Sequence, residues 1–153
     1  MITDFRQATI HDAGLLVDIY NASFLSDYKR FGTCLGYGKT IEEMEESIRL
    51  YSKHIILCDS KPVGCISCHQ SGPQEYEIGC LCVIPEYQGK GIGTQAIRFA
   101  QNYYDDWKRL ILVTPLYKRE NIRFYTERCG FQIVGTKRDG HVELARFMME
   151  RQI

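Results

Sequence analysis

The sequence predicts a mixed α/β domain built around one central sheet. The apolar residues recur with a helical period up to about residue 51, with a strand-like period up to residue 84, and then in both forms alternately. The length of 153 residues suits one domain, and the content of 44% hydrophobic and 25% charged residues is ordinary for a globular protein. We therefore expect a single domain over residues 1–153 with the order β-α-α-β-β-β-α-β-α-β-β.

The first third of the chain predicts one strand and two helices. Residues 2–8 form the strand, and Thr9 with Asp12 has the spacing of a capping box that starts the first helix. The apolar stripe of that helix consists of Leu15, Leu16, Ile19, Tyr20 and Phe24. A loop is expected over residues 26–39, and Thr40 with Glu43 forms a second capping box in front of the second helix.

The middle of the chain predicts three antiparallel strands. Apolar and β-branched runs over 54–59, 62–70 and 75–84 are separated by short turns at Ser60-Lys61 and Ser71-Gly72-Pro73. A glycine-rich loop follows over residues 88–93.

The last third predicts two helices and three strands. The apolar stripe of the third helix consists of Ala96, Phe99, Ala100, Tyr103 and Trp107. A strand over 109–114 precedes a short helix over 120–129 that ends at Gly130, a typical residue after a helix. Strands over 131–135 and 142–149 are joined around Asp139-Gly140, which is a strong hairpin signal.

Charge and cysteine content exclude several classes of protein. Lys plus Arg and Asp plus Glu both number 19, so no bulk positive charge is available to attract nucleic acid. No apolar stretch approaches the ~20 residues of a membrane span, and the N-terminus has no signal-peptide pattern. The seven cysteines lack zinc-ligand spacing, so we interpret them as free, mostly packing residues without a metal, and expect a cytoplasmic protein.

The glycine-rich loop is the strongest functional signal. A buried strand leads into Gln88–Thr94, which opens a long helix. Successive backbone N–H groups at such a junction can bind an anion, and the helix dipole adds partial positive charge. A dinucleotide fingerprint is not met, because Thr94 occupies the position of its third glycine.

Three motifs resemble one family. Gln88-Gly89-Lys90-Gly91-Ile92-Gly93 is similar to the Gln/Arg-x-x-Gly-x-Gly/Ala signature of the GNAT (Gcn5-related) N-acetyltransferases. Val83-x-Pro85, and Phe124-Tyr125 followed by Gly130-Phe131, also resemble that family, as does the order of elements. The resemblance covers nearly the whole chain. It implies a central, mostly antiparallel sheet of about seven strands with splayed fourth and fifth strands, and about four helices.

The resemblance also implies the cofactor and its binding residues. The co-substrate would be acetyl-CoA, with no metal. The backbone at Cys82 or Val83 would polarise the acetyl carbonyl, a role worth ~3–4 kcal/mol per donor in other enzymes. The residues expected to bind the pyrophosphate are Gln88, Gly89, Lys90, Gly91, Ile92, Gly93 and Thr94.

Catalytic roles follow from the same resemblance. Tyr125 matches the tyrosine that protonates the departing thiolate, and it also belongs to an apolar helical stripe that predicts packing. Glu77 matches a glutamate base found in some members, with His69 and His141 as further candidates.

One position departs from the family pattern. Lys118 replaces an asparagine that contacts CoA in many members. Asn121, one helical turn later, is therefore an alternative contact to the cofactor, and Lys118 could instead approach a CoA phosphate.

The expected reaction is direct transfer of an acetyl group to a primary amine in a ternary complex. The resemblance places the acceptor against the first two helices, their loop (Tyr28, Lys29, Arg30, Phe31, Tyr37) and the last hairpin. A small-molecule amine and a protein or peptide amine both remain open, as does an acetyl-CoA-binding sensor or scaffold without turnover. Homodimers are frequent in the family. Cys82 lies nearest the expected thioester, and it is the cysteine to test as an acyl carrier.

Overall fold

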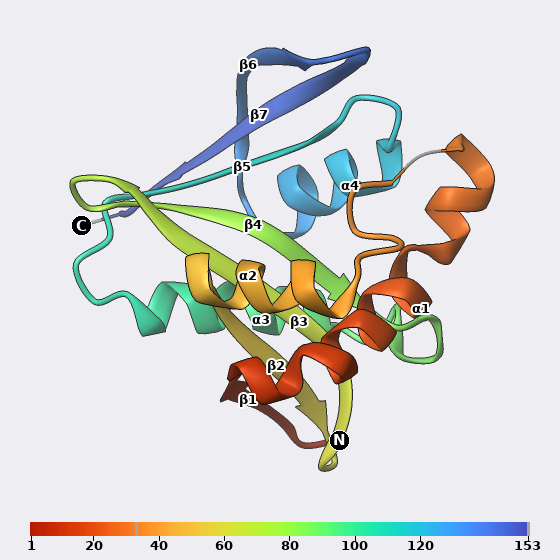
Figure 1. The fold of residues 1–153 in the computed structure, drawn as a ribbon. Coiled ribbons are helices and arrows are strands. Elements are labelled where there is room, and N and C mark those ends of the chain that lie inside the picture. The colour runs from red at the N-terminus through yellow and green to blue at the C-terminus, as the bar shows by residue number, and fades with distance from the viewer. Residues whose placement is uncertain (33, 153) are drawn as a thin grey trace. The chain divides into compact units, whose positions relative to one another are not determined.

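The computed structural model describes residues 1–32 and 34–152, and these contain a seven-stranded sheet. The hydrogen-bonded strand order is β1-β2-β3-β4-β5-β7-β6 (Figure 1). The strands are β1 (Thr3–Gln7), β2 (Ser52–Cys58), β3 (Lys61–Gly72), β4 (Glu75–Val83), β5 (Arg109–Pro115), β6 (Gln132–Asp139) and β7 (Val142–Glu150). The helices are α1 (Ala13–Phe31), α2 (Ile41–Leu50), α3 (Ile92–Tyr103) and α4 (Arg119–Arg123). The predicted fold class and element order are confirmed.

Contacts divide the chain into two compact units. The first contains residues 1–68 and 80–99, and the second contains residues 69–79 and 100–152. Strands β3 and β4 each run from one unit into the other, so each unit is described by itself.

In the first unit, helices cover both faces of β1 to β3. On one face, Lys53 of β2 donates a hydrogen bond to Tyr20 of α1. On the other face, the ring of Phe99 of α3 stacks on Phe5 of β1 at 4.3 Å between ring centroids and meets His54 of β2 edge-on. The alternation of side chains along a strand explains this, because neighbours such as Lys53 and His54 point to opposite faces.

The second unit holds the remaining pairings. β4 pairs with β5 in parallel over Glu75–Glu77 against Arg109–Ile111, the first three residues of each strand. This short pairing at one end is the arrangement expected of splayed strands. β5 and β6 both pair antiparallel with β7, and the hairpin turn at Gly140 has a φ of 60°.

Three predicted boundaries were wrong. The strand expected over residues 131–135 continues to Asp139, as β6. The loop expected over residues 26–39 begins later, because α1 continues to Phe31 and ends at Gly32, whose φ is 80°; position 33 lies outside the described residues. The third helix ends at Tyr103, so Trp107 is not part of it. Trp107 is nevertheless buried, because the chain after α3 turns back toward the helix. Its indole N–H donates to the Gln101 carbonyl at 2.9 Å.

The capping boxes were predicted correctly. The Thr40 hydroxyl accepts from the Glu43 N–H at 3.0 Å, and the Glu43 carboxylate accepts from the Thr40 N–H at 2.9 Å. The pKa of Glu43 is accordingly lowered, chiefly by the hydrogen bond from the Thr40 backbone. At the other box, the Thr9 N–H donates to Asp12 at 2.9 Å.

Candidate functional site

The glycine loop joins β4 to α3 within the first unit. After β4 ends at Val83, a 3-10 turn leads to Gln88, and α3 begins at Ile92. Gly89 and Gly91 have φ values of 73° and 82°, which residues with a side chain rarely adopt. A Cβ at either position would meet no atom within 4 Å, so both glycines border open space. The loop therefore presents backbone to solvent, as an anion site requires.

The start of α3 supplies the donors. The Gln95 N–H donates to the Gly91 carbonyl at 3.2 Å, which begins the hydrogen bonding of the helix. The N–H groups of Ile92, Gly93 and Thr94 precede it and have no acceptor inside the helix. With the helix dipole, they form a site that suits a compact anion such as a diphosphate. Lys90 is exposed in the same loop.

The Gln88 side chain is bonded to the end of β4. Its side-chain amide donates to the Val83 carbonyl at 2.9 Å, across the turn that separates strand from loop. The Gln88 N–H donates to the Pro85 carbonyl at 3.2 Å. The glutamine of the signature thus fixes the loop to the end of β4.

The peptide groups at the end of β4 distinguish Cys82 from Val83. The Ile84 N–H donates to the Val63 carbonyl of β3 at 2.8 Å. The Cys82 carbonyl also faces β3, since a Cβ added to Gly64 would lie 2.3 Å from its oxygen. The Cys82 carbonyl and the Val83 N–H belong to the same trans peptide group, and they point in opposite directions. The Val83 N–H therefore points away from β3. Of the two candidates, Val83 therefore has the N–H that β3 leaves unused.

A cluster of polar and thiol groups lies on the α1 face of the first unit. We call its residues, Lys53, Tyr20, Cys65, Cys80 and Cys82, the thiol cluster; Cys80 is half-buried and the other four are buried. The Lys53 ammonium donates to the Tyr20 hydroxyl at 2.8 Å, and that hydroxyl lies 3.9 Å from the Cys65 sulfur. Lys53 is 4% exposed, and the residues that the structure describes give it no carboxylate partner.

The three thiols of the cluster differ in pKa. A hydrogen bond from Cys82, followed by one from Tyr20 and the charge of Lys53, lowers the pKa of Cys80 to about 7 against the effect of burial. The bond with Cys80 and burial raise the pKa of Cys82 well above its usual range. Burial raises the pKa of Cys65 to about 12.

Cys80 is therefore the acidic thiol of β4, whereas sequence reasoning singled out Cys82. The two cysteines lie two positions apart and therefore share a face of the strand. The lysine and the tyrosine come from distant segments, and sequence reasoning missed them. All seven cysteines are free, and Cys58, Cys65, Cys68 and Cys82 are buried, which agrees with the expected packing role. Among residues 1–32 and 34–152, no group of three or more His, Cys, Asp or Glu side chains is arranged so that it could hold a metal ion.

Tyr125 lies in the second unit, on a π-helical turn (Phe124–Arg128) that follows α4 directly. The Cys129 N–H donates to the Phe124 carbonyl, five residues earlier, at 3.2 Å. Tyr125 is buried against Phe131 and Phe147, with ring centroids 5.8 and 5.7 Å away. Its ring therefore has the packing role that the stripe predicted. π-turns are also frequent at functional sites.

Asn121 is half-buried, and its amide donates to the Thr114 hydroxyl of β5 at 3.1 Å. Its side chain is thus already fixed by the protein. The Lys118 carbonyl accepts from the Asn121 N–H at 3.0 Å at the start of α4, and Lys118 itself is half-buried.

Glu77 lines a hollow of about 440 Å³ in the second unit. The Glu77 carboxylate lies 3.9 Å from His69 Nε2, with side-chain exposures of 30% and 33%. The structure thus brings two of the candidate bases together. His141 is exposed in the hairpin turn between β6 and β7.

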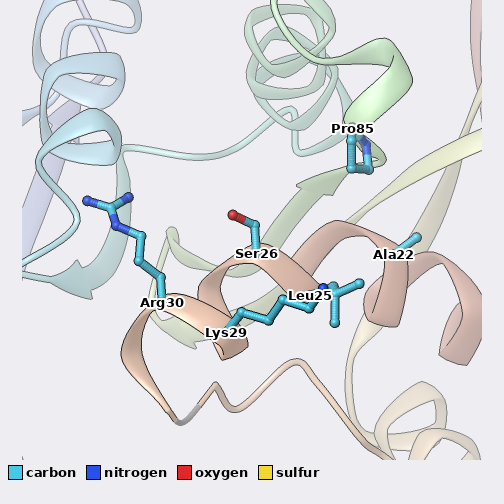
Figure 2. A pocket seen from close by; sticks show the side chains of 6 residues that line it. All are labelled: Ala22, Leu25, Ser26, Lys29, Arg30 and Pro85. Atoms are coloured by element: carbon cyan, nitrogen blue, oxygen red, sulfur yellow. The ribbon is translucent and has the colours of Figure 1, made fainter.

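A second hollow, of about 460 Å³, lies in the first unit (Figure 2). It is bordered by Pro85, which follows β4, and by one side of α1: Ala22, Leu25, Ser26, Lys29 and Arg30. Lys29 and Arg30, which were expected near the acceptor, both line this hollow. Tyr28 and Tyr37, expected there too, stack on one another at 4.5 Å between ring centroids.

The comparison with protein families assigns this chain to one of them. Residues 16–131, more than half of the chain, match the Acetyltransferase (GNAT) family, so the chain belongs to that family. It is 34% identical over 87 residues to the uncharacterised protein YrkN of Bacillus subtilis, a match covering 56% of this chain and 47% of YrkN. The matched part thus spans about half the length of that relative.

Solved structures share the fold. An acetyltransferase from Thermus thermophilus superposes with a TM-score of 0.81 at 21% identity, covering 99% of this chain and 98% of the other. The PaiA N-acetyltransferase of Thermoplasma acidophilum, solved in complex with coenzyme A, has a TM-score of 0.76 at 18% identity, covering 95% and 98%. The aminoglycoside acetyltransferase AAC(6')-Ib, solved with coenzyme A and kanamycin, has a TM-score of 0.77 at 18% identity, covering 98% and 95%.

No helix among the described residues combines the length and apolar character needed to cross a membrane.

Proposed function

We propose that the protein is an acetyl-CoA-dependent N-acetyltransferase that acetylates a primary amine by direct transfer in a ternary complex. The observation that carries this proposal is the glycine loop, where Gly89 and Gly91 keep positive φ values beside open space at the start of α3. Members of the family with this fold have been solved with coenzyme A.

In this proposal the loop from Gln88 to Thr94 holds the pyrophosphate. The N–H groups at the start of α3 donate to the phosphate oxygens, and Lys90 adds a positive charge at the rim. A side chain at Gly91 would intrude on this space. The bound cofactor supplies a thioester, whose acetyl group is the one transferred.

The Val83 N–H would polarise the acetyl carbonyl, since it points away from β3. The Cys82 N–H remains the alternative donor, although it lies on the side of β4 that faces β3. A donor fixed in a strand needs no reorganisation when negative charge develops on the carbonyl oxygen.

Proton transfer would involve Glu77 and Tyr125. The attacking amine must be neutral, and Glu77, with His69 beside it, would accept its proton directly or through water. Tyr125 would donate a proton to the departing thiolate. Asn121 would contact the cofactor while its amide stays bonded to Thr114, and Lys118 is the alternative contact.

We infer a small-molecule amine as the acceptor, because the two hollows, of about 440 and 460 Å³, have the size of small-molecule sites. A protein or peptide amine is the alternative, and an acetyl-CoA sensor without turnover is another. We expect a cytoplasmic enzyme; a homodimer, frequent in the family, is the assembly to examine by light scattering.

The proposal is tested by isothermal titration with acetyl-CoA, followed by thiol release with a panel of small amines and lysine peptides. Gly91→Ala should weaken acetyl-CoA binding at least tenfold. Gly130→Ala is the matched control, since Gly130 has a φ of 85° and open space but lies after the π-turn. Both substitutions introduce about 1–2 kcal/mol of strain, so only a loss specific to Gly91 supports the loop. Binding without turnover would favour the sensor, and no binding would contradict both.

A further inference from the structure

The hollow that contains Glu77 lies over one face of the strands of the second unit. It is lined by Glu75, Glu77, Ile111, Leu112, Val113, Val134, Thr136, Lys137, Arg146, Phe147 and Met148. Its floor is apolar, and its charged groups come from β4 on one side and from the β6–β7 hairpin on the other. An acceptor lying on this floor would meet both sets of charges.

The strand register separates the acidic and basic sides. Glu77 pairs with Ile111 of β5, and Ile111 pairs with Met148 of β7. Arg146, two residues before Met148, pairs with Val113. With a strand spacing of about 4.8 Å and a rise of about 3.3 Å per residue, the Cα atoms of Glu77 and Arg146 lie about 12 Å apart.

Gly135 leaves room for the arginine head group. It pairs with Arg146 across the β6–β7 ladder, and a Cβ built on it would lie 3.9 Å from an Arg146 guanidinium nitrogen. The guanidinium therefore lies over a position without a side chain, on the border of the hollow.

The charges around the hollow are not balanced within the protein. The Glu75 carboxylate pairs with Arg109 at 3.1 Å, and Arg138 pairs with Glu143 at 2.9 Å. Within the described part of the chain, neither Lys137 nor Arg146 has a carboxylate partner. Two cations are thus available to an anion on the hairpin side.

We propose that the acceptor is an amine that also carries a carboxylate or similar anion, bound by Arg146 and Lys137 at the opposite side of the hollow from Glu77. A guanidinium is suited to this task because its planar fork matches a carboxylate with two parallel hydrogen bonds. The amine end then lies toward Glu77, which can accept its proton. This inference rests on the proposed function and narrows its substrate class.

The test compares ω-amino acids of three to six carbons with their carboxamides, at saturating acetyl-CoA. Thiol release measures turnover, and titration calorimetry in the presence of CoA measures binding. The wild-type protein should prefer the carboxylates at least tenfold in kcat/KM. Arg146→Gln should remove that preference mainly through KM, with the activity on carboxamides retained. Lys137→Gln should reduce it partly.

Arg138→Gln is the control, because Arg138 lies on the same hairpin outside the hollow. Equal use of carboxylates and carboxamides by the wild type, or an unchanged preference in Arg146→Gln, would overturn the inference. If no amine is turned over, the binding arm decides: carboxylates that bind the wild type but not Arg146→Gln support it, and their failure to bind overturns it. Failure of acetyl-CoA to bind would count against the proposed function instead.

Discussion

The acidity of Cys80 can be tested without knowing any substrate. The perturbation is Cys82→Ala, which removes the hydrogen bond that contributes most to lowering the pKa of Cys80 to about 7. Cys82→Ser is the matched control, because a serine hydroxyl can still donate to the Cys80 thiolate. Only the alanine variant should move the pKa of Cys80 upward.

The size of the effect follows from the thiolate fraction. At pH 7, a thiol with a pKa of about 7 is about half ionised, whereas one at the ordinary 9.0 is about 1% ionised. A thiolate of lower pKa is intrinsically less reactive, by about 6- to 10-fold for two pKa units. The wild-type Cys80 should therefore react about 5- to 8-fold faster at pH 7 than an ordinary thiol of equal access.

The assay is alkylation by iodoacetamide between pH 5 and 10, with the modified cysteine identified by peptide mass spectrometry. Below pH 7 the thiol is protonated, so the rate should fall tenfold per pH unit; above pH 7 it should level off. The midpoint should stay near 7 in Cys82→Ser and rise toward 9 in Cys82→Ala. A wild-type midpoint above 8.5, or coincident midpoints in the two variants, would refute the reasoning.

Three further predictions concern the fold and the reaction. Gly64→Ala should destabilise the protein by about 1–3 kcal/mol, because its Cβ would lie 2.3 Å from the Cys82 carbonyl oxygen. Gly14→Ala is the control, because a Cβ there meets open space. Equal melting temperatures of these two variants would contradict the clash. Thr40→Ala should lower the free energy of unfolding by about 1 kcal/mol in urea titrations, and no change would show that the cap contributes nothing. Tyr125→Phe should reduce kcat strongly while acetyl-CoA affinity, measured by calorimetry, is nearly retained; a normal kcat would exclude the acid role.

Local signals predicted most of the fold. The Thr40 capping box, the turn at Gly140 and the apolar run of β2 depend on residues within a few positions of each other, so a single sequence contains them. The glycine loop was predicted for the same reason. These local rules also predicted the antiparallel pairing of neighbouring strands, and the resemblance to a family supplied the splayed fourth and fifth strands.

The incorrect boundaries have tertiary causes. The residues 26–31 lack an apolar stripe and therefore resembled a loop, but no helix breaker stops α1 before Gly32 takes up a left-handed conformation. Tyr28 also gains a stacking partner in Tyr37, outside the helix. Trp107 matched the helical period by spacing alone, although its side chain is buried by a turn back onto Gln101.

The acidity of Cys80 has a tertiary cause in part, since after the hydrogen bond from Cys82 it depends on a tyrosine from α1 and a lysine from β2. Lys53 is 4% exposed. A positive charge on so buried a side chain is unfavourable unless a nearby hydrogen-bond acceptor or anion offsets it. The Tyr20 hydroxyl accepts a hydrogen bond from the ammonium, and a thiolate at Cys80 adds the negative charge that no carboxylate among the described residues provides. Lys53→Met should therefore raise the pKa of Cys80, whereas Cys80→Ala should leave the Lys53 ammonium without that anion. If the pH midpoint of Cys80 alkylation were unchanged in Lys53→Met, the lysine and the thiolate would not be coupled.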